Sequence, residues 1–188
     1  MTIIYIHGFN SSPASLKARQ TKDWLEKSSL DRSFLCPALD GDTFIAIDQL
    51  QTIIDQCKEP VGLIGSSLGG YYATWLANKY GLKAVLVNPA VCPYESMNEY
   101  LGENTNYHSG ERYMLNQSHI DMLRDLDTKE ICAPDSIWVL LQTGDEVLDY
   151  RQAKMKYFHC ILTIEPGGDH SFQNYTRHLP AIIDFLQP

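Results

Sequence analysis

A chain of 188 residues is long enough for one domain with a single sizeable core, and 44% hydrophobic and 20% charged residues are ordinary for a soluble globular protein. The formal net charge of -8 argues against nucleic acid and anionic membranes as partners, although it leaves a small anionic substrate possible. The opening MTIIYIHGFN lacks the pattern of a signal peptide and no stretch has the length of a transmembrane helix, so we expect a cytoplasmic protein.

The five cysteines give no sign of a disulfide framework or a zinc site, because their number is odd, their spacing is wide and no CxxC pair occurs. They are Cys36, Cys57, Cys92, Cys132 and Cys160. Scattered buried thiols in a reducing cytosol are the expectation.

The chain alternates short apolar runs with longer amphipathic stretches. The apolar runs predict strands over 2–6, 33–36, 61–65, 83–89, 136–142 and 160–165. The amphipathic stretches predict helices over 14–29, 43–57, 67–80 and 150–158. Asp42 or Thr43 is expected to cap the second helix. The last helical pattern runs from Phe172 to Leu186, and Pro180 either bends that helix or begins its main part.

This alternation predicts an α/β fold: a three-layer α/β/α sandwich around a mostly parallel, doubly wound sheet of about six strands. The strands are apolar throughout, as expected where helices cover both faces of a sheet. No linker or repeat interrupts the pattern, so residues 1–188 are expected to form a single domain.

Residues 92–133 break the rhythm, since no strand is evident there and polar residues are dense. We expect a partly helical insertion that acts as a lid or pocket wall, since long excursions in compact domains are usually functional lids or mobile loops; a plain covering segment is the alternative. Its tyrosines would supply hydroxyls to a pocket, or serve as core residues: Tyr94, Tyr100, Tyr107 and Tyr113.

The stretch GSSLG at 65–69 matches G-x-S-x-G with Ser67 at its centre. A serine on a sharp turn from strand to helix has strained backbone angles and an exposed hydroxyl, and Gly65 and Gly69 remove the clashes that side chains would cause. Such a match arises by chance in about one chain in twenty of this length. Here the motif follows a predicted strand and begins a predicted helix, which is the context a nucleophilic serine requires.

A nucleophilic serine needs a base and a carboxylate, in the order Ser, Asp or Glu, His along the chain. Asp145 follows the predicted strand 136–142 in LLQTGDEVLDY and is the preferred carboxylate. Glu146 and Asp149 are rivals, although Asp149 also suits a helix N-cap.

His170 is the preferred base, because it follows the last predicted strand on the glycine-rich loop EPGGDHSF. Its neighbour Asp169 is expected to be a solvated loop residue or a turn former. The weaker candidates are the histidines at 108 and 119 in the insertion, at 159 on the opposite sheet edge, and at 178 within a helix.

The oxyanion formed during acyl transfer needs two N–H donors. Leu68, directly after the serine, supplies one; the other is expected in HGFNSSP at Phe9, with the Asn10 side chain as an alternative donor. Gly8 allows close approach of the backbone, and His7 is interpreted as a structural residue rather than a base.

These motifs resemble the α/β-hydrolase superfamily and, within it, the small YqiA-type bacterial esterases. The resemblance rests on HGFNSSP, GSSLGGYYA, TGDEVLDY and GGDHSF and covers essentially the whole chain. It implies a minimal hydrolase fold whose first strand carries the oxyanion loop. It also implies an esterase acting on small-molecule esters of short acyl chains, with Ser67, Asp145 and His170 as the triad.

The expected reaction is acyl transfer through Ser67, which requires no metal and no organic cofactor. An acyl thioesterase is the close rival, and a hydrolase-fold protein that only binds a ligand or partner is the rival from another class. A metallohydrolase built from Asp145, Asp169, His170 and His7 has little support, because no recognisable ligand spacing occurs.

Overall fold

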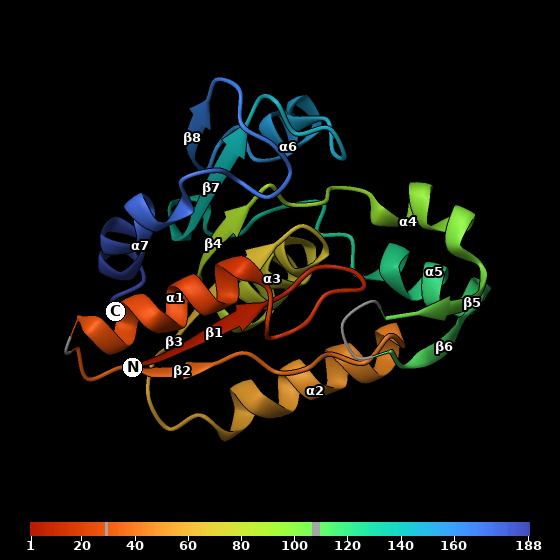
Figure 1. The fold of residues 1–188 in the computed structure, drawn as a ribbon, viewed down its shortest axis with the longest axis horizontal. Helices are drawn as coiled ribbons and strands as arrows, with labels where there is room; N and C mark the ends of the chain where they lie inside the picture. The colour runs from red at the N-terminus through yellow and green to blue at the C-terminus, as the bar shows by residue number, and fades with distance from the viewer. Residues whose placement is uncertain (29, 107–109) are drawn as a thin grey trace.

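A six-stranded sheet lies at the centre of the molecule (Figure 1) in a computed structural model that describes residues 1–28, 30–106 and 110–188. The strand order is β2-β1-β3-β4-β7-β8, and every neighbouring pair is parallel. The strands are β1 Thr2–Ile6, β2 Ser33–Leu35, β3 Val61–Ser66, β4 Lys83–Val87, β7 Ile137–Gln142 and β8 Ile161–Glu165. All six predicted strands are therefore confirmed, with small differences at their ends.

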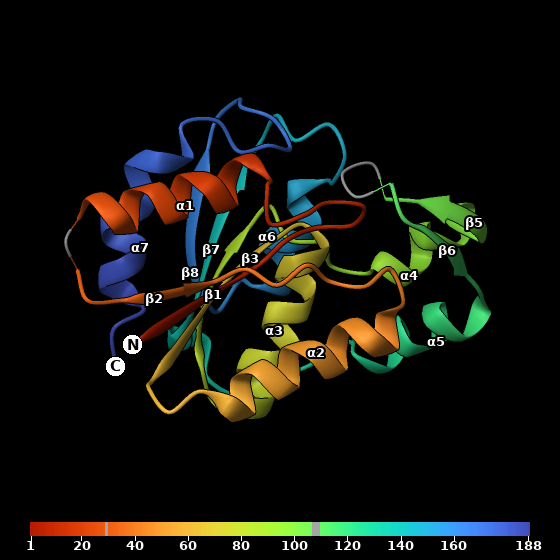
Figure 2. The same cartoon turned by 60° about the horizontal axis from the view of Figure 1, so that its bottom comes forward.

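Helices cover both faces of this sheet. Alternate residues of each strand point to opposite faces, and both faces are apolar, so each face packs against helices. Ile3 and Tyr5 of β1 pack with α1 (Leu16–Lys27) and α7 (Leu179–Phe185). The opposite face, which includes Ile4 and Ile6, packs against three other helices (Figure 2). These are α2 (Thr43–Gln56), α3 (Leu68–Tyr80) and α6 (Tyr150–Lys156). The predicted three-layer, doubly wound α/β architecture is confirmed.

The ends of the helices follow from local chemistry. Asp42 caps α2 by accepting hydrogen bonds from the N–H groups of Phe44 and Ile45. The C-terminal helical stretch begins as a 3-10 turn, η3 (Tyr175–His178), and α7 follows it with Pro180 in its first turn. Pro180 thus begins the main part of the last helix, one of the two roles expected for it.

The segment 92–133 contains an antiparallel hairpin that the sequence did not predict. Strands β5 (Gly102–Thr105) and β6 (Arg112–Leu115) pair with each other and, among the described residues, with no strand of the main sheet. Each has only four residues, and GENT has little intrinsic preference for a strand, so pairing rather than propensity forms this hairpin. Tyr107 and His108 lie outside the described residues.

The rest of this segment is partly helical, as expected, and it packs on the main sheet's helices. It comprises α4 (Pro93–Ser96), η1 (Met97–Tyr100) and α5 (Gln117–Asp125), and η2 (Pro134–Ser136) follows it. Its side chains at Leu115, Ile120 and Leu123 are buried in the core on the α2 and α3 face. The Tyr71 hydroxyl donates to the Leu123 carbonyl at 2.5 Å, so α3 and α5 are joined by a hydrogen bond as well as by apolar contact.

All five cysteines are free thiols. Cys132 is exposed and the other four are half-buried, so the thiols are less buried than expected, because these residues lie at element ends and loops rather than at core positions. Burial raises the pKa of the Cys36 thiol to about 12 and that of Cys160 to about 11, which keeps both protonated at neutral pH. No helix in the described ranges is long and apolar enough to cross a membrane.

Candidate active site

Ser67 occupies the turn between β3 and α3 with φ 55° and ψ -124°. A positive φ is unfavourable for any residue other than glycine, and such strain concentrates at functional sites. The turn is held from both sides: the Ser67 N–H donates to the Val87 carbonyl at 3.1 Å, and the Ser67 carbonyl accepts from Gly70 at 2.9 Å and from Ala90 at 3.0 Å. Hydrogen bonds to the β4 strand and its following loop therefore hold the strained conformation.

The glycines around Ser67 are required by their neighbours. A Cβ atom on Gly65 would overlap the Gly69 backbone, the clash within the turn that the motif predicts. A Cβ atom on Gly69 would instead overlap the carbonyl of Ile6 in β1, so this glycine is needed for the close approach of α3 to the neighbouring strand. At Gly8, a Cβ atom would lie 3.2 Å from the Ser67 Cβ, which explains why this loop can pass directly over the serine.

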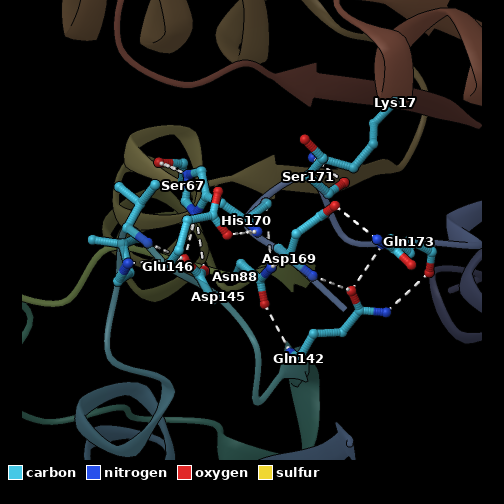
Figure 3. Close-up of polar contacts among 12 residues, drawn as sticks. Lys17, Ser67, Asn88, Gln142, Asp145, Glu146, Asp169, His170, Ser171 and Gln173 are labelled. Atoms are coloured by element: carbon cyan, nitrogen blue, oxygen red, sulfur yellow. Dashed lines mark hydrogen bonds and ion pairs between the residues drawn. The ribbon is translucent and has the colours of Figure 1, made fainter. Parts of the chain in front are cut away.

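Ser67, His170 and Asp145 form a continuous chain of hydrogen bonds (Figure 3). The His170 Nε2 atom lies 3.1 Å from the Ser67 Oγ. The His170 Nδ1 atom lies 2.8 Å from one carboxylate oxygen of Asp145 and 3.0 Å from the other. The structure thus brings together three residues that come from the loops after β3, β7 and β8.

The Asp145 carboxylate is fixed and almost fully buried, with only 2% of its side chain exposed. One of its oxygens accepts hydrogen bonds from the N–H groups of Val147 at 2.9 Å and Leu148 at 2.8 Å. Burial alone would raise the pKa of Asp145, but the bonds from His170 and from these two N–H groups outweigh it and hold the pKa below its usual value. Asp145 is therefore an anion at neutral pH, and it favours the His170 tautomer with its proton on Nδ1.

The two rival carboxylates have other partners. Glu146 accepts a hydrogen bond from the main-chain N–H of His170 at 3.0 Å, so it positions the histidine loop from outside the chain of three. Asp149 caps α6 through the N–H of Arg151, as its place before that helix suggested.

Two residues that sequence reasoning missed, Asn88 and Gln142, support the loop that carries His170. Asn88, directly after β4, donates through its side-chain amide to the main-chain oxygens of Asp169 at 3.0 Å and His170 at 3.2 Å. Its side-chain oxygen accepts from the Gln142 N–H at 3.0 Å. The Gln142 side-chain oxygen in turn accepts from the N–H groups of Asp169 at 3.2 Å and Gln173 at 2.8 Å. The sequence held one signal for both residues: each is a polar residue at, or directly after, the end of an otherwise apolar strand.

Asp169 forms a turn, since its carbonyl accepts from the Phe172 N–H at 3.0 Å. The expectation of a turn former is therefore confirmed. The alternative, a solvated side chain, is wrong: one carboxylate oxygen accepts from Gln173 at 2.9 Å and the other is buried without a hydrogen-bond partner in the described ranges. The loop folds back over the β7 end, which removes this oxygen from water.

Leu68 and Phe9 both line the space at Ser67, where the sequence predicts oxyanion donors. Within the described part of the chain, neither main-chain N–H has a protein acceptor. The Asn10 side-chain oxygen accepts from the Tyr113 hydroxyl at 2.6 Å, so this side chain is tied to the hairpin. His7 accepts from the Leu39 N–H at 3.2 Å and lies 3.0 Å from the Gly8 carbonyl, contacts that suit the structural role expected for it.

Two cavities open at Ser67. The first, of about 280 Å³, we call the apolar cavity; its wall includes Ala90, Val91, Met97, Tyr100, Val147 and Leu148. The second, of about 260 Å³, we call the polar cavity; its wall includes Ser11, Ser15, Lys17, His170 and Ser171. Ser67 and Phe9 border both, so a substrate bound across the serine would extend into two chemically different spaces.

None of the other described candidate histidines belongs to this chain of three: His159, which precedes β8, contacts the Phe158 ring at 3.5 Å between ring centroids, and the other two lie in separate pairs. His119 of α5 contacts Asp42 at 3.0 Å, and His178 contacts Glu165 at 2.9 Å. Among the residues that can be placed, no three His, Cys, Asp or Glu side chains form a group that could hold a metal ion. His7 and Asp169 accordingly do not join Asp145 and His170 in such a group.

The parallel sheet and the serine turn after β3 define an α/β-hydrolase fold, and solved structures agree. Mouse alpha/beta hydrolase domain-containing protein 10 superposes with a TM-score of 0.73 at 18% identity, over 99% of this chain and 90% of its own. The monoacylglycerol lipase of Paleococcus ferrophilus gives 0.71 at 14% identity, over 98% and 94%. At these identities the likeness shows the fold alone.

The chain belongs to the uncharacterised protein family UPF0227, whose model matches residues 2–187. One relative is the UPF0227 protein PM0825 of Pasteurella multocida (strain Pm70), which is 26% identical over 198 residues, spanning 98% of this chain and 99% of the relative. The family and the fold agree with the resemblance to YqiA-type members of the α/β-hydrolase superfamily.

Proposed function

We propose that this protein is a serine esterase that hydrolyses small carboxylic esters of short acyl chains through an acyl-enzyme on Ser67. The observation that carries the proposal is the chain of hydrogen bonds from the Ser67 hydroxyl through His170 to the buried Asp145 carboxylate. A nucleophile bonded to a base, and a base oriented by a third group, is the arrangement that activates a serine.

In the first step His170 accepts the Ser67 hydroxyl proton at Nε2 while Oγ forms a bond to the ester carbonyl carbon. The carbonyl oxygen becomes an oxyanion, which the N–H groups of Leu68 and Phe9 stabilise. Asp145 stabilises the imidazolium that forms, and does not itself take the proton. The tetrahedral adduct then loses the alcohol, which leaves with the proton from Nε2, and the acyl group remains on Oγ.

In the second step a water molecule gives its proton to Nε2 of His170 and bonds to the acyl carbon. The second tetrahedral adduct breaks its bond to Oγ, the carboxylic acid leaves, and Ser67 recovers its proton. All proton transfers use one imidazole, which the Asp145 contact keeps in a fixed orientation at Nδ1.

The apolar cavity supports a short acyl chain as the acyl part of the substrate. The lining of this cavity of about 280 Å³ includes Val147 and Leu148, and Met97 and Tyr100 of the 92–133 segment. Phe9 and Tyr100 meet edge to face at 5.2 Å between ring centroids. We therefore propose the 92–133 segment as the wall or lid of the acyl site.

The test uses p-nitrophenyl esters of increasing acyl length, with Ser67→Ala as the nucleophile variant and Ser66→Ala as its neighbour control. Loss of Ser67 lowers kcat by about ten-thousandfold or more, while Ser66→Ala retains most of the activity. A fluorophosphonate probe labels the wild type at Ser67. Folded wild-type protein that neither hydrolyses these esters nor takes the label would overturn the proposal and favour a protein that only binds a ligand.

A further inference from the structure

The polar cavity contains a lysine that the acyl-transfer mechanism does not use. Lys17 lies in the first turn of α1, and its side chain extends toward the histidine loop, where Nζ donates to the Ser171 carbonyl at 2.9 Å (Figure 3). Within the described ranges no carboxylate forms an ion pair with Lys17. An ammonium group has three donors, so this one retains hydrogen-bonding capacity beside the catalytic loop.

The carboxylates that act on Lys17 do so from beyond ion-pair distance. Burial lowers the pKa of Lys17 to about 8, and the charges of Asp169 and Asp145 oppose that shift without reaching ion-pair distance. The amine therefore remains mainly protonated at neutral pH, and it is a partly desolvated cation. Such a group is stabilised by an anion that enters its cavity.

A second polar group of the polar cavity, the Ser15 hydroxyl, has no hydrogen-bond partner within the described ranges. This hydroxyl is buried. Ser15 precedes α1 but its side chain does not cap that helix. A buried hydroxyl without a partner is costly, and rotation of the Ser15 side chain toward the polar cavity, which this residue lines, would let a ligand oxygen accept its proton.

The position of His170 decides which part of an ester enters the polar cavity. The leaving alcohol must receive its proton from Nε2 of His170, so it has to lie on the side of Ser67 where that imidazole is exposed. His170 lines the polar cavity and does not line the apolar cavity. The alcohol part of the substrate therefore extends toward Lys17, and the acyl part extends away from it.

We propose that the polar cavity is an anion subsite in which Lys17 and Ser15 bind a carboxylate or phosphate carried by the alcohol part of the ester. The natural substrates are then short-chain acyl esters of a hydroxy acid or of a phosphorylated alcohol. This inference rests on the proposed esterase function and adds the chemical class of the leaving group.

The experiment compares three acetate esters whose aryl leaving groups differ in charge, together with one succinate ester. The substrates are para-acetoxybenzoate, para-acetoxyphenyl phosphate and the neutral para-acetoxybenzamide; phenyl hydrogen succinate carries its anion on the acyl side instead. Each is measured with the wild type, Lys17→Met, Lys17→Arg and Lys22→Met. Lys22 is an exposed lysine of the same helix and serves as the matched control. For each substrate, the ratio of kcat/KM in the variant to kcat/KM in the wild type is compared, because this ratio cancels the intrinsic reactivity of the leaving group.

We expect Lys17→Met to lower kcat/KM about tenfold or more for at least one of the two esters with an anionic alcohol part, mainly through KM. The same variant should change the neutral and succinate esters less than twofold. Lys17→Arg should recover part of the loss, and Lys22→Met should change none of the four substrates. Of the carboxylate ester and the phosphate ester, the one whose kcat/KM decreases more in Lys17→Met carries the preferred anionic group.

An equal loss on all four esters would overturn the proposal, because it would show that Lys17 only supports the Ser171 carbonyl and the histidine loop. No loss on any ester would overturn it as well. Both outcomes leave the esterase function intact, provided that neutral-ester hydrolysis by the wild type disappears in Ser67→Ala. If the wild type hydrolyses none of the esters, the esterase function fails and the subsite fails with it. Inhibition of the wild type by para-hydroxybenzoate but not by para-hydroxybenzamide gives a second readout without any variant.

Discussion

The Asn88 side chain donates a hydrogen bond to the main-chain oxygen of His170 at 3.2 Å, so a residue at the end of β4 holds a residue in the loop after β8. Asn88 also accepts from the Gln142 N–H at the end of β7. The carboxyl ends of three strands are thereby joined through one buried side chain. Because parallel strands end at the same edge, a single polar residue there can fix the position of a base that lies far away in the sequence.

Asn88→Ala is therefore expected to lower kcat about tenfold to a hundredfold by loosening the His170 loop, with a smaller change in KM. Its loss leaves the buried Gln142 N–H without its acceptor and removes the donor to the Asp169 and His170 carbonyls, which costs about 1–3 kcal/mol of unfolding free energy. Ester hydrolysis and urea unfolding measure the two effects. Asn88→Asp keeps the acceptor for Gln142 but sets a carboxylate oxygen against the Asp169 and His170 carbonyls, so it is expected to lower kcat as well. Unchanged kcat in a folded Asn88→Ala variant would show that Asn88 does not position His170.

Gly69→Ala is expected to destabilise the protein by a few kcal/mol, because the added methyl group would overlap the Ile6 carbonyl in the neighbouring strand. Gly81→Ala is the matched comparison: Gly81 has φ 65° and open space around its Cβ position, so only about 1 kcal/mol of backbone strain is expected. Urea unfolding of both variants gives the two free energies. Equal decreases in unfolding free energy would mean that α3 and β1 move apart at little cost to make room for the methyl group.

Asp145→Asn is expected to lower kcat by about ten-thousandfold, since an amide at this position favours the wrong tautomer of His170. The same substitution tests a pH dependence of stability. The pKa of Asp145 is lower in the folded protein than its usual value of 3.8, so its contribution to stability is present at neutral pH and is lost as the pH falls through the folded pKa. The difference in unfolding free energy between wild type and variant should therefore be larger near pH 7 than near pH 3. A difference that stays constant would argue against a stabilised carboxylate.

Strand and helix order, the serine turn and the positions of Asp145 and His170 could be predicted, because each depends on local patterns at strand ends. The β5–β6 hairpin could not, since each strand has only four residues, GENT has little strand propensity, and the two strands exist through pairing with each other. Asn88 and Gln142 were missed because their role depends on contacts across the sheet edge. Lys17 was missed for the same reason: only the fold brings the start of α1 beside the histidine loop.

The preference for an anionic leaving group is expected to decrease as the pH rises through about 8, the pKa of Lys17. That value lies below the usual 10.5 of a lysine, so the folded protein loses this positive charge in a range where free lysine would keep it. The ratio of kcat/KM for para-acetoxybenzoate to that for para-acetoxybenzamide isolates this effect, because both reactions depend equally on the protonation of His170. It should decrease between about pH 7 and about pH 9.5 in the wild type, stay level in Lys17→Met, and stay high in Lys17→Arg, whose guanidinium remains charged. A wild-type ratio that does not change over this range would contradict a charge on Lys17 as the source of the preference.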